Sequence, residues 1–194
     1  RGDVPNIKFF IFFFLLFPRV VWVPMKTHST IMVKKFGGTS VGSIERIEKV
    51  ADRIAMDRSQ GQKAIVVASA MSGETNRLVR LANEIDPCYR GSAYDMLVAS
   101  GEQVSVALLA IALKKRGLSA VPLLAHQLGI ETDAIFSKAR ITRVNGEKLL
   151  GFVHDDIVPI VAGFQGVTDG DKITTLGRGG SDTTALALAA AIGL

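Results

Sequence analysis

The sequence contains very little cysteine and histidine. Cys88 is its one cysteine, and a single cysteine cannot form a disulfide within the chain. This excludes a secreted, disulfide-stapled scaffold and indicates a reducing compartment, so we expect a cytoplasmic protein. The three histidines, His28, His126 and His154, do not have the spacing of metal ligands, and we predict no metal-ligating residue in the chain.

Long basic runs are also absent. The formal net charge is +5, but the 19 basic and 17 acidic residues in positions 32–194 leave only +2 there. No run of five or more Lys or Arg occurs, and aromatic residues are not interleaved with basic ones. A surface that follows a phosphate backbone needs more positive charge than this, so we do not expect nucleic acid as a partner.

The phenylalanine-rich run near the N-terminus is too short to span a membrane. The run FFIFFFLLF covers only residues 9–17, whereas a transmembrane helix needs about 20 apolar residues. A basic flank precedes the run as in a signal peptide, but no small-x-small cleavage site follows. We therefore expect neither membrane insertion nor export.

The first thirty residues differ in composition from the rest. We interpret residues 1–30 as an apolar N-terminal extension that is foreign to the domain at 31–194. Our hypothesis is that residues 1–24 arise from upstream translation or an artefact, and that the natural start is Met25 or Met32.

What the sequence does contain is an alternation of short apolar strands and helices. Its 48% apolar and 21% charged residues are typical of one globular domain. The run AIVVA at 64–68 is apolar throughout, as in a strand buried on both faces of a parallel sheet. Ser43 is a suitable helix N-cap, and Gly117 a suitable helix stop. The predicted strands are 31–36, 64–68, 120–124 and 157–162, and the predicted helices are 44–60, 75–85, 94–116 and 181–192. Residues 149–154 are predicted to end a further helix between the last two strands.

This order of elements predicts a layered α/β fold with a mostly parallel sheet. Ligands of such folds bind at the carboxyl ends of the strands. Three unusual loops fall at those ends.

The first loop is KFGGTS at residues 35–40. Its glycines, Gly37 and Gly38, allow backbone N–H groups to face a phosphate, and Lys35 at the end of the strand can reach the same anion. Neither the Walker A pattern nor the G-x-G-x-x-G pattern is present. A tight turn without function is the alternative.

The second loop is SAMSGETN at residues 69–76. Its hydroxyl groups, including those of Ser69 and Thr75, suit hydrogen bonding to a small polar ligand. The alternative is that Ser72 or Thr75 simply caps the following helix. The spacing alone does not decide between the two.

The third loop is TTLGRGGSD at residues 174–182. Arg178 can hold a carboxylate or phosphate through two hydrogen bonds, while Ser181 and Asp182 open a helix whose N-terminus favours an acid. A turn with only a structural role needs neither the arginine nor three glycines, so function is favoured.

Glu102, in ASGEQ, interrupts an apolar helix. It is either a surface residue or a buried group that binds a cation. The apolar residues around it favour the second.

The motifs KFGGTS, SAMSGETN, ASGEQ, GFQG and TTLGRGGSD, in this order, closely resemble the aspartokinases of the amino acid kinase family. The resemblance runs from about Met32 to Leu194 and implies the three-layer α/β/α sandwich of that family, incomplete at its C-terminus. It implies that Lys35, Gly37, Gly38 and Ser40 bind the phosphates of ATP. It further implies that Ser69, Thr75, Glu102, Arg178 and Ser181 bind aspartate, and that Lys35 and Asp182 are catalytic.

The implied activity is transfer of the γ-phosphate of ATP, with Mg²⁺ bridging the phosphates, to the β-carboxylate of L-aspartate. This is the first step toward lysine, threonine and methionine. Family members continue with a nucleotide-holding segment that resembles TDVDGVYTADPR, and then with ACT-type regulatory domains. We therefore expect the 194-residue chain to be an inactive fragment of a homo-oligomeric enzyme. The alternatives are a kinase of another small amino acid, or a non-catalytic aspartate-binding or subunit-interaction module.

Overall fold

A computed structural model describes residues 30–194, so the interpretations of residues 1–29 lie outside the described part of the chain. Its main sheet, sheet A, has four parallel strands in the order β1-β2-β6-β3. Because β6 lies between β2 and β3, a late part of the sequence completes the centre of the sheet. The strands are β1 (Ile31–Phe36), β2 (Lys63–Ala68), β3 (Ala120–Leu123) and β6 (Val158–Ala162).

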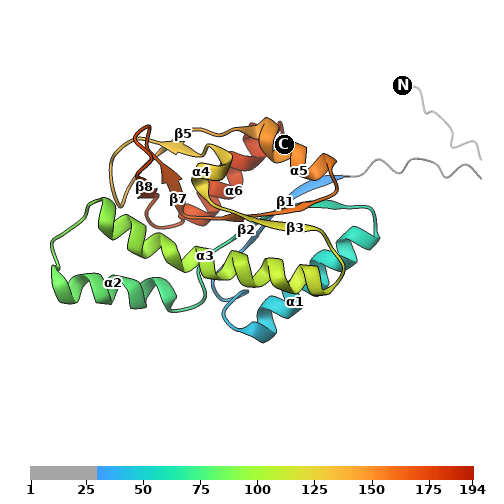
Figure 1. Ribbon diagram of the computed structural model, residues 1–194, viewed down its shortest axis with the longest axis horizontal. Helices are drawn as coiled ribbons and strands as arrows, with labels where there is room; N and C mark the ends of the chain where they lie inside the picture. The colour runs from blue at the N-terminus through green and yellow to red at the C-terminus, as the bar shows by residue number, and fades with distance from the viewer. Residues whose placement is uncertain (1–29) are drawn as a thin grey trace, which may run out of the picture.

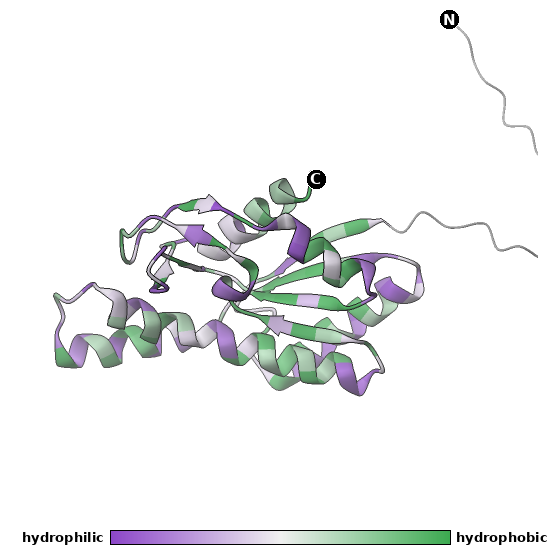
Figure 2. Ribbon diagram, turned by 45° about the horizontal axis from the view of Figure 1, so that its top comes forward, coloured by the Kyte–Doolittle hydropathy of each residue, from purple (hydrophilic) through white to green (hydrophobic). Residues whose placement is uncertain are grey.

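Helices cover both faces of sheet A, which gives three layers (Figure 1). Alternate residues of β2 point to opposite faces, as a strand requires: Val66 joins one apolar cluster and Ile65 the other. The first cluster contains α1 (Ile44–Ser59) and α3 (Ser92–Lys115), and the second contains α4 (Ala125–Leu128), α5 (Gly146–His154) and α6 (Gly180–Ala191). Figure 2 shows the strands of sheet A as mostly hydrophobic. The predicted α/β sandwich with a parallel sheet is therefore confirmed.

The 24-residue helix α3 is the central helix of one layer. Among residues 30–194 it is the one helix that is long and apolar enough to cross a membrane, but 56% of its most apolar window is buried within the protein. It packs on α1 and on the sheet, and α2 (Glu74–Ile85) packs alongside it beyond the end of the sheet (Figure 1). Its apolar composition is thus that of a core helix.

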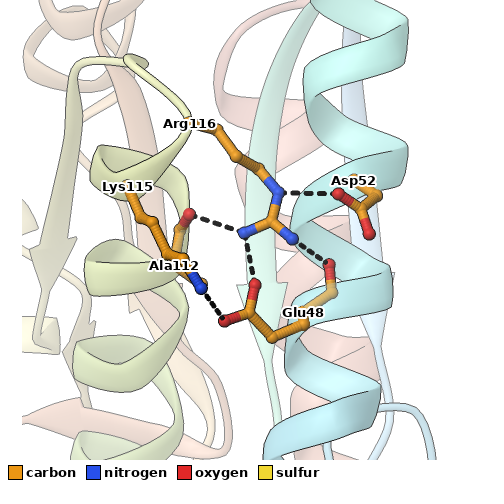
Figure 3. A network of polar contacts seen from close by, with 5 residues as sticks. All are labelled: Glu48, Asp52, Ala112, Lys115 and Arg116. Carbon is orange, nitrogen blue, oxygen red and sulfur yellow. Dashed lines mark hydrogen bonds and ion pairs between the residues drawn. The ribbon is translucent and has the colours of Figure 1, made fainter.

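A network of charged side chains joins the two helices of this layer (Figure 3). The Arg116 guanidinium forms ion pairs with Glu48 at 2.6 Å and with Asp52 at 2.8 Å, and Lys115 pairs with Glu48 at 3.2 Å. These bonds hold the pKa of the Glu48 and Asp52 carboxyls below their ordinary values. Arg116 thus links the C-terminus of α3 to the middle of α1.

A second small sheet, which the sequence did not lead us to predict, lies beside the first. Its order is β5-β4-β7-β8, with both parallel and antiparallel pairs. The strands are β4 (Glu131–Thr132), β5 (Ile141–Arg143), β7 (Gln165–Val167) and β8 (Ile173–Thr175). These runs of two or three residues are too short for periodicity to be recognised. The sheet matters because β8 leads into the loop that carries Arg178.

The predicted element boundaries need small corrections. The Ser43 hydroxyl accepts a hydrogen bond from the Arg46 N–H and caps α1, and Gly117 has φ +77° after α3, both as predicted. The alternative role of the second loop was wrong: Gly73, with φ 84°, is the N-cap of α2, and no side chain caps this helix. α5 ends at His154 as predicted, and it begins at Gly146 because Asn145 caps it through a hydrogen bond from the Lys148 N–H.

Candidate active site

The three loops come together around a cavity of about 620 Å³. The parallel sheet places the first two loops at one edge, because its strands all end there, whereas the third loop follows β8 of the second sheet. Most of the predicted site residues line this cavity: Lys35, Ser69, Thr75, Glu102, Arg178, Ser181 and Asp182.

Lys35 and Asp182 form an ion pair in the cavity lining. Lys35 lies near the end of β1, Asp182 lies in the first turn of α6, and their nitrogen and oxygen atoms are 2.9 Å apart. The two side chains are 28% and 65% exposed, so an incoming phosphate can reach the lysine. The Asp182 carboxylate at the helix N-terminus is also favoured by the helix dipole.

The glycine loop adjoins Lys35 outside the cavity lining. The carbonyl oxygen of Gly37 accepts hydrogen bonds from the Ser40 and Val41 N–H groups, which forms a tight turn. Within residues 30–194 the N–H groups of Gly37 and Gly38 have no acceptor, so both are available to an anion. A Cβ at Gly38 would lie 2.9 Å from the carbonyl oxygen of Ala70. Only glycine therefore allows the first and second loops to approach this closely. Ser40 is exposed beside them.

Glu102 is a buried acid with an unused oxygen. It is 2% exposed, its Oε1 accepts a hydrogen bond from the Ala70 N–H at 3.0 Å, and its Oε2 has no partner. Burial raises the pKa of the Glu102 carboxyl to about 7. The expectation of a buried group is confirmed, and the surface alternative is wrong. Since buried acceptors are normally satisfied, the free oxygen suits a positively charged ligand.

Two glycines allow these buried groups to approach the loops. A Cβ at Gly101 would lie 2.9 Å from the Cβ of Ala70, so glycine lets α3 bring Glu102 against the second loop. A Cβ at Gly163 would lie 2.7 Å from the Oγ of Ser181, which is 8% exposed. Ser69 and Thr75 are half-buried.

Arg178 lines the cavity from the loop between β8 and α6. Its neighbours Gly177 and Gly179 have φ of 80° and 74°, conformations that side chains rarely adopt. Arg178 is exposed and forms no ion pair with any residue in the described part of the chain. It is therefore free to bind the carboxylate of a ligand.

Sequence reasoning missed four residues at this site. Ser137, Phe164 and Thr175 line the cavity, and Asp95 lies behind it with no exposed surface. Asp95 had one available signal: it is an acid in an apolar helix, seven positions before Glu102 and thus on the same face. Phe164 and Thr175 lie within the motifs GFQG and TTLGRGGSD, which gave a signal for them, whereas Ser137 comes from the loop between β4 and β5.

Residues 30–194 contain no group of three or more Cys, His, Asp or Glu side chains that could hold a metal ion. Asp182 is the one acidic side chain beside Lys35 in the cavity lining. This fits a Mg²⁺ ion that enters on nucleotide phosphates, because Mg²⁺ at phosphate sites needs only one or two carboxylates.

The chain belongs to the amino acid kinase family, whose sequence profile matches residues 30–194. Its curated relatives include an aspartate kinase of Pseudomonas putida, 52% identical over 162 residues, which are 84% of this chain and 39% of the relative. The structure of aspartate kinase from Synechocystis matches with a TM-score of 0.71 and 46% identity, over 84% of this chain and 27% of that one. E. coli aspartokinase III, crystallised with aspartate and ADP, matches with a TM-score of 0.72 and 26% identity, over 84% of this chain and 47% of that one. The resemblance to aspartokinases is therefore confirmed.

Proposed function

We propose that this chain supplies the aspartate-binding and phosphate-binding half of an aspartate kinase. The complete reaction transfers the γ-phosphate of ATP to the β-carboxylate of L-aspartate and gives 4-phospho-L-aspartate. The observation that carries the proposal is the free oxygen of buried Glu102, which lines the same cavity as Arg178 and Lys35. The names of the relatives support the same substrate, and the chain spans 39% of the length of the P. putida enzyme.

The proposed substrate pose follows from charge. Aspartate has one ammonium and two carboxylates. Glu102 accepts the ammonium, and Arg178 holds the α-carboxylate together with the hydroxyls of Ser69, Thr75 and Ser181. This leaves the β-carboxylate free to face Lys35.

The proposed transfer depends on positioning and charge. An oxygen of the β-carboxylate forms the new bond to the γ-phosphorus, the bond from that phosphorus to the β–γ bridging oxygen breaks, and ADP leaves with both electrons. Lys35 and the amides of Gly37 and Gly38 stabilise the charge on the transferred group, with Ser40 beside them. Asp182 orients Lys35. Mg²⁺, when bound to the phosphates, neutralises part of their charge.

Residues 30–194 are proposed to bind aspartate on their own. A non-catalytic aspartate-binding module is the second candidate, because the groups proposed for aspartate lie in the lining of one cavity. We further propose a cytoplasmic, homo-oligomeric enzyme with a role in lysine, threonine and methionine synthesis, and with neither membrane nor nucleic acid as a partner.

Titration calorimetry of the chain with L-aspartate and with succinate tests the site. Succinate lacks the ammonium, so we expect it to bind far more weakly than aspartate. The substitution Glu102→Gln should abolish this preference, whereas Glu84→Gln, on the exposed face of α2, should leave it intact. Equal binding of aspartate and succinate by the parent chain would refute the proposed role of Glu102. A coupled ADP-release assay on the complete gene product separates the kinase from the non-catalytic module.

A further inference from the structure

Two buried carboxylates lie on one face of α3, and they differ in their hydrogen bonding. Asp95 and Glu102 are seven positions apart, which is two helical turns and about 10.5 Å along the axis. Glu102 keeps Oε2 free at the cavity. Both oxygens of Asp95 are used, and its side chain does not line the cavity.

The partners of Asp95 both belong to the cavity lining, in segments outside α3. Its Oδ2 accepts the N–H groups of Ser137 at 2.9 Å and Thr175 at 2.7 Å, and its Oδ1 accepts the Ser137 hydroxyl at 3.0 Å. Thr175 is the last residue of β8, three residues before Arg178. Through these bonds one carboxylate ties β8 and the loop between β4 and β5 to α3.

Ser137 would not hold its conformation without such support. Its φ is +66°, in the left-handed region where a side chain costs energy and persists only when neighbouring groups enforce it. Asp95 binds both the backbone N–H and the hydroxyl of this residue. The carbonyl of Ser137 in turn packs on Gly177, where a Cβ would lie 3.3 Å from its oxygen. Asp95 therefore sets the position of the residue directly before Arg178.

We infer that Asp95 is a positioning residue that fixes Arg178 relative to Glu102, so that the α-end of the substrate is held in one place and only a side chain of the length of aspartate ends correctly before Lys35. This inference rests on the proposed function, because it assumes that these two residues bind the ammonium and the α-carboxylate. Asp95 touches neither ligand nor phosphate. It acts by fastening the arginine loop to the helix that carries Glu102.

Length selection follows from this rigidity. A substrate held at its ammonium and at its α-carboxylate directs its side chain toward Lys35, and glutamate would extend it by one methylene. One methylene is worth about 10–200-fold in discrimination when the site does not adjust. A loop released from α3 can shift to accommodate the longer chain, so loss of Asp95 lowers selectivity as well as affinity.

The test compares Asp95→Asn with Asp133→Asn in the 194-residue chain. Asp133 is the matched control because its Oδ1 also accepts two backbone N–H groups, from Ile135 and Arg140, but within its own loop. The asparagine at 95 presents an NH₂ group to donors and cannot satisfy all three. Calorimetry should give an aspartate Kd raised about 10–100-fold for Asp95→Asn. The ratio of glutamate Kd to aspartate Kd should fall by a similar factor, while Asp133→Asn lowers only the Tm.

A second substitution separates positioning from stability. Glycine adopts positive φ without strain, so Ser137→Gly in the Asp95→Asn background should recover part of the selectivity. Should Asp95→Asn not fold, Ser137→Ala, which removes only the hydroxyl bond to Oδ1, should lower selectivity in the same direction to a smaller extent. Unchanged selectivity in these variants, or an equal loss in Asp133→Asn, would overturn the inference alone. Failure of the parent chain to bind aspartate would overturn the proposed function and this inference with it.

Discussion

The ammonium of Lys35 and the carboxylate of Asp182 are 2.9 Å apart, so the first strand and the last helix of the described chain meet in one charged pair. Asp182 belongs to the first turn of α6, whose dipole favours an acid at this position. The partly exposed pair orients the lysine toward the cavity and leaves it accessible to a phosphate.

Replacement of this lysine should affect catalysis much more than stability. We expect Lys35→Ala to lower the turnover of the complete gene product about 10²–10³-fold, because a group that stabilises developing charge is lost. Lys63→Ala is the matched control: its side chain is 22% exposed, and it lies at the start of β2, at the opposite edge of the sheet. A coupled ADP-release assay measures both variants. Normal turnover of Lys35→Ala would show that the proposed mechanism is wrong.

Aspartate binding should strengthen as the pH rises through about 7, where burial places the pKa of Glu102. The neutral acid below this pH cannot pair with an ammonium, whereas the carboxylate above it can. The affinity measured by calorimetry from pH 5.5 to 8.5 should therefore increase and then level off. The affinity of Glu102→Gln should not change with pH in this way. Aspartate binding by the parent chain that does not depend on pH would contradict the prediction.

The same group makes stability depend on pH in the opposite sense. Because the folded pKa of Glu102 lies above the ordinary value of 4.5, the folded chain holds more protons than the unfolded chain between the two values. The contribution of Glu102 to stability should thus fall as the pH rises from 4.5 to about 7. Urea unfolding of the parent and of Glu102→Gln over this range measures it. A difference between the two that stays constant with pH would argue against burial of the ionised group.

An alanine at position 38 should separate the first two loops. Its Cβ would meet the Ala70 carbonyl oxygen at 2.9 Å, a backbone atom that cannot turn away. We expect a cost of about 1–3 kcal/mol in the free energy of unfolding and weaker phosphate binding. Gly151→Ala in α5 has open space around the added Cβ and should be neutral or slightly stabilising. Urea titration distinguishes the two, and similar curves would disprove the close approach.

The ion-pair network between α1 and α3 should make a small contribution to stability that depends on salt and acid. Hydrogen bonds from Arg116 lower the pKa of the Glu48 and Asp52 carboxyls below their ordinary values of 4.5 and 3.8. The stabilisation from these two carboxylates is therefore complete at a pH above the ordinary values. It is lost as the pH falls through the lowered pKa values. We expect Arg116→Ala to lower the Tm by less than about 3 °C at pH 7, and by less in high salt. Arg80→Ala in α2 is the control. An equal Tm loss at pH 7 and in strong acid would contradict this account.

How far the sequence could predict the fold depended on the length of each element. The continuous apolar run at 64–68 indicated a strand buried on both faces, and Ile65 and Val66 do point to opposite clusters. The small sheet could not be predicted, because its strands contain two or three residues and are held by tertiary contacts such as the 2.6 Å hydroxyl bond between Thr132 and Thr174.

The candidate site was predictable where glycine and charge occur together. The glycine-flanked Arg178 lines the cavity, and Glu102 is buried as its apolar neighbours indicated. Ser137 could not be predicted, because its strained backbone depends on Asp95, a residue far away in the sequence. The roles of the site residues in binding and transfer remain predictions for the experiments above.

The position of β6 between β2 and β3 has a consequence for synthesis of the protein. β2 and β3 emerge from the ribosome first, but neither can pair with the other, because their common neighbour begins at Val158. At about 5–20 residues per second, translation leaves β2 without this neighbour for several seconds. A chaperone that shields apolar segments would find β2 during that interval. Lys35, made among the first residues of the domain, receives its charged partner only when the last helix has emerged.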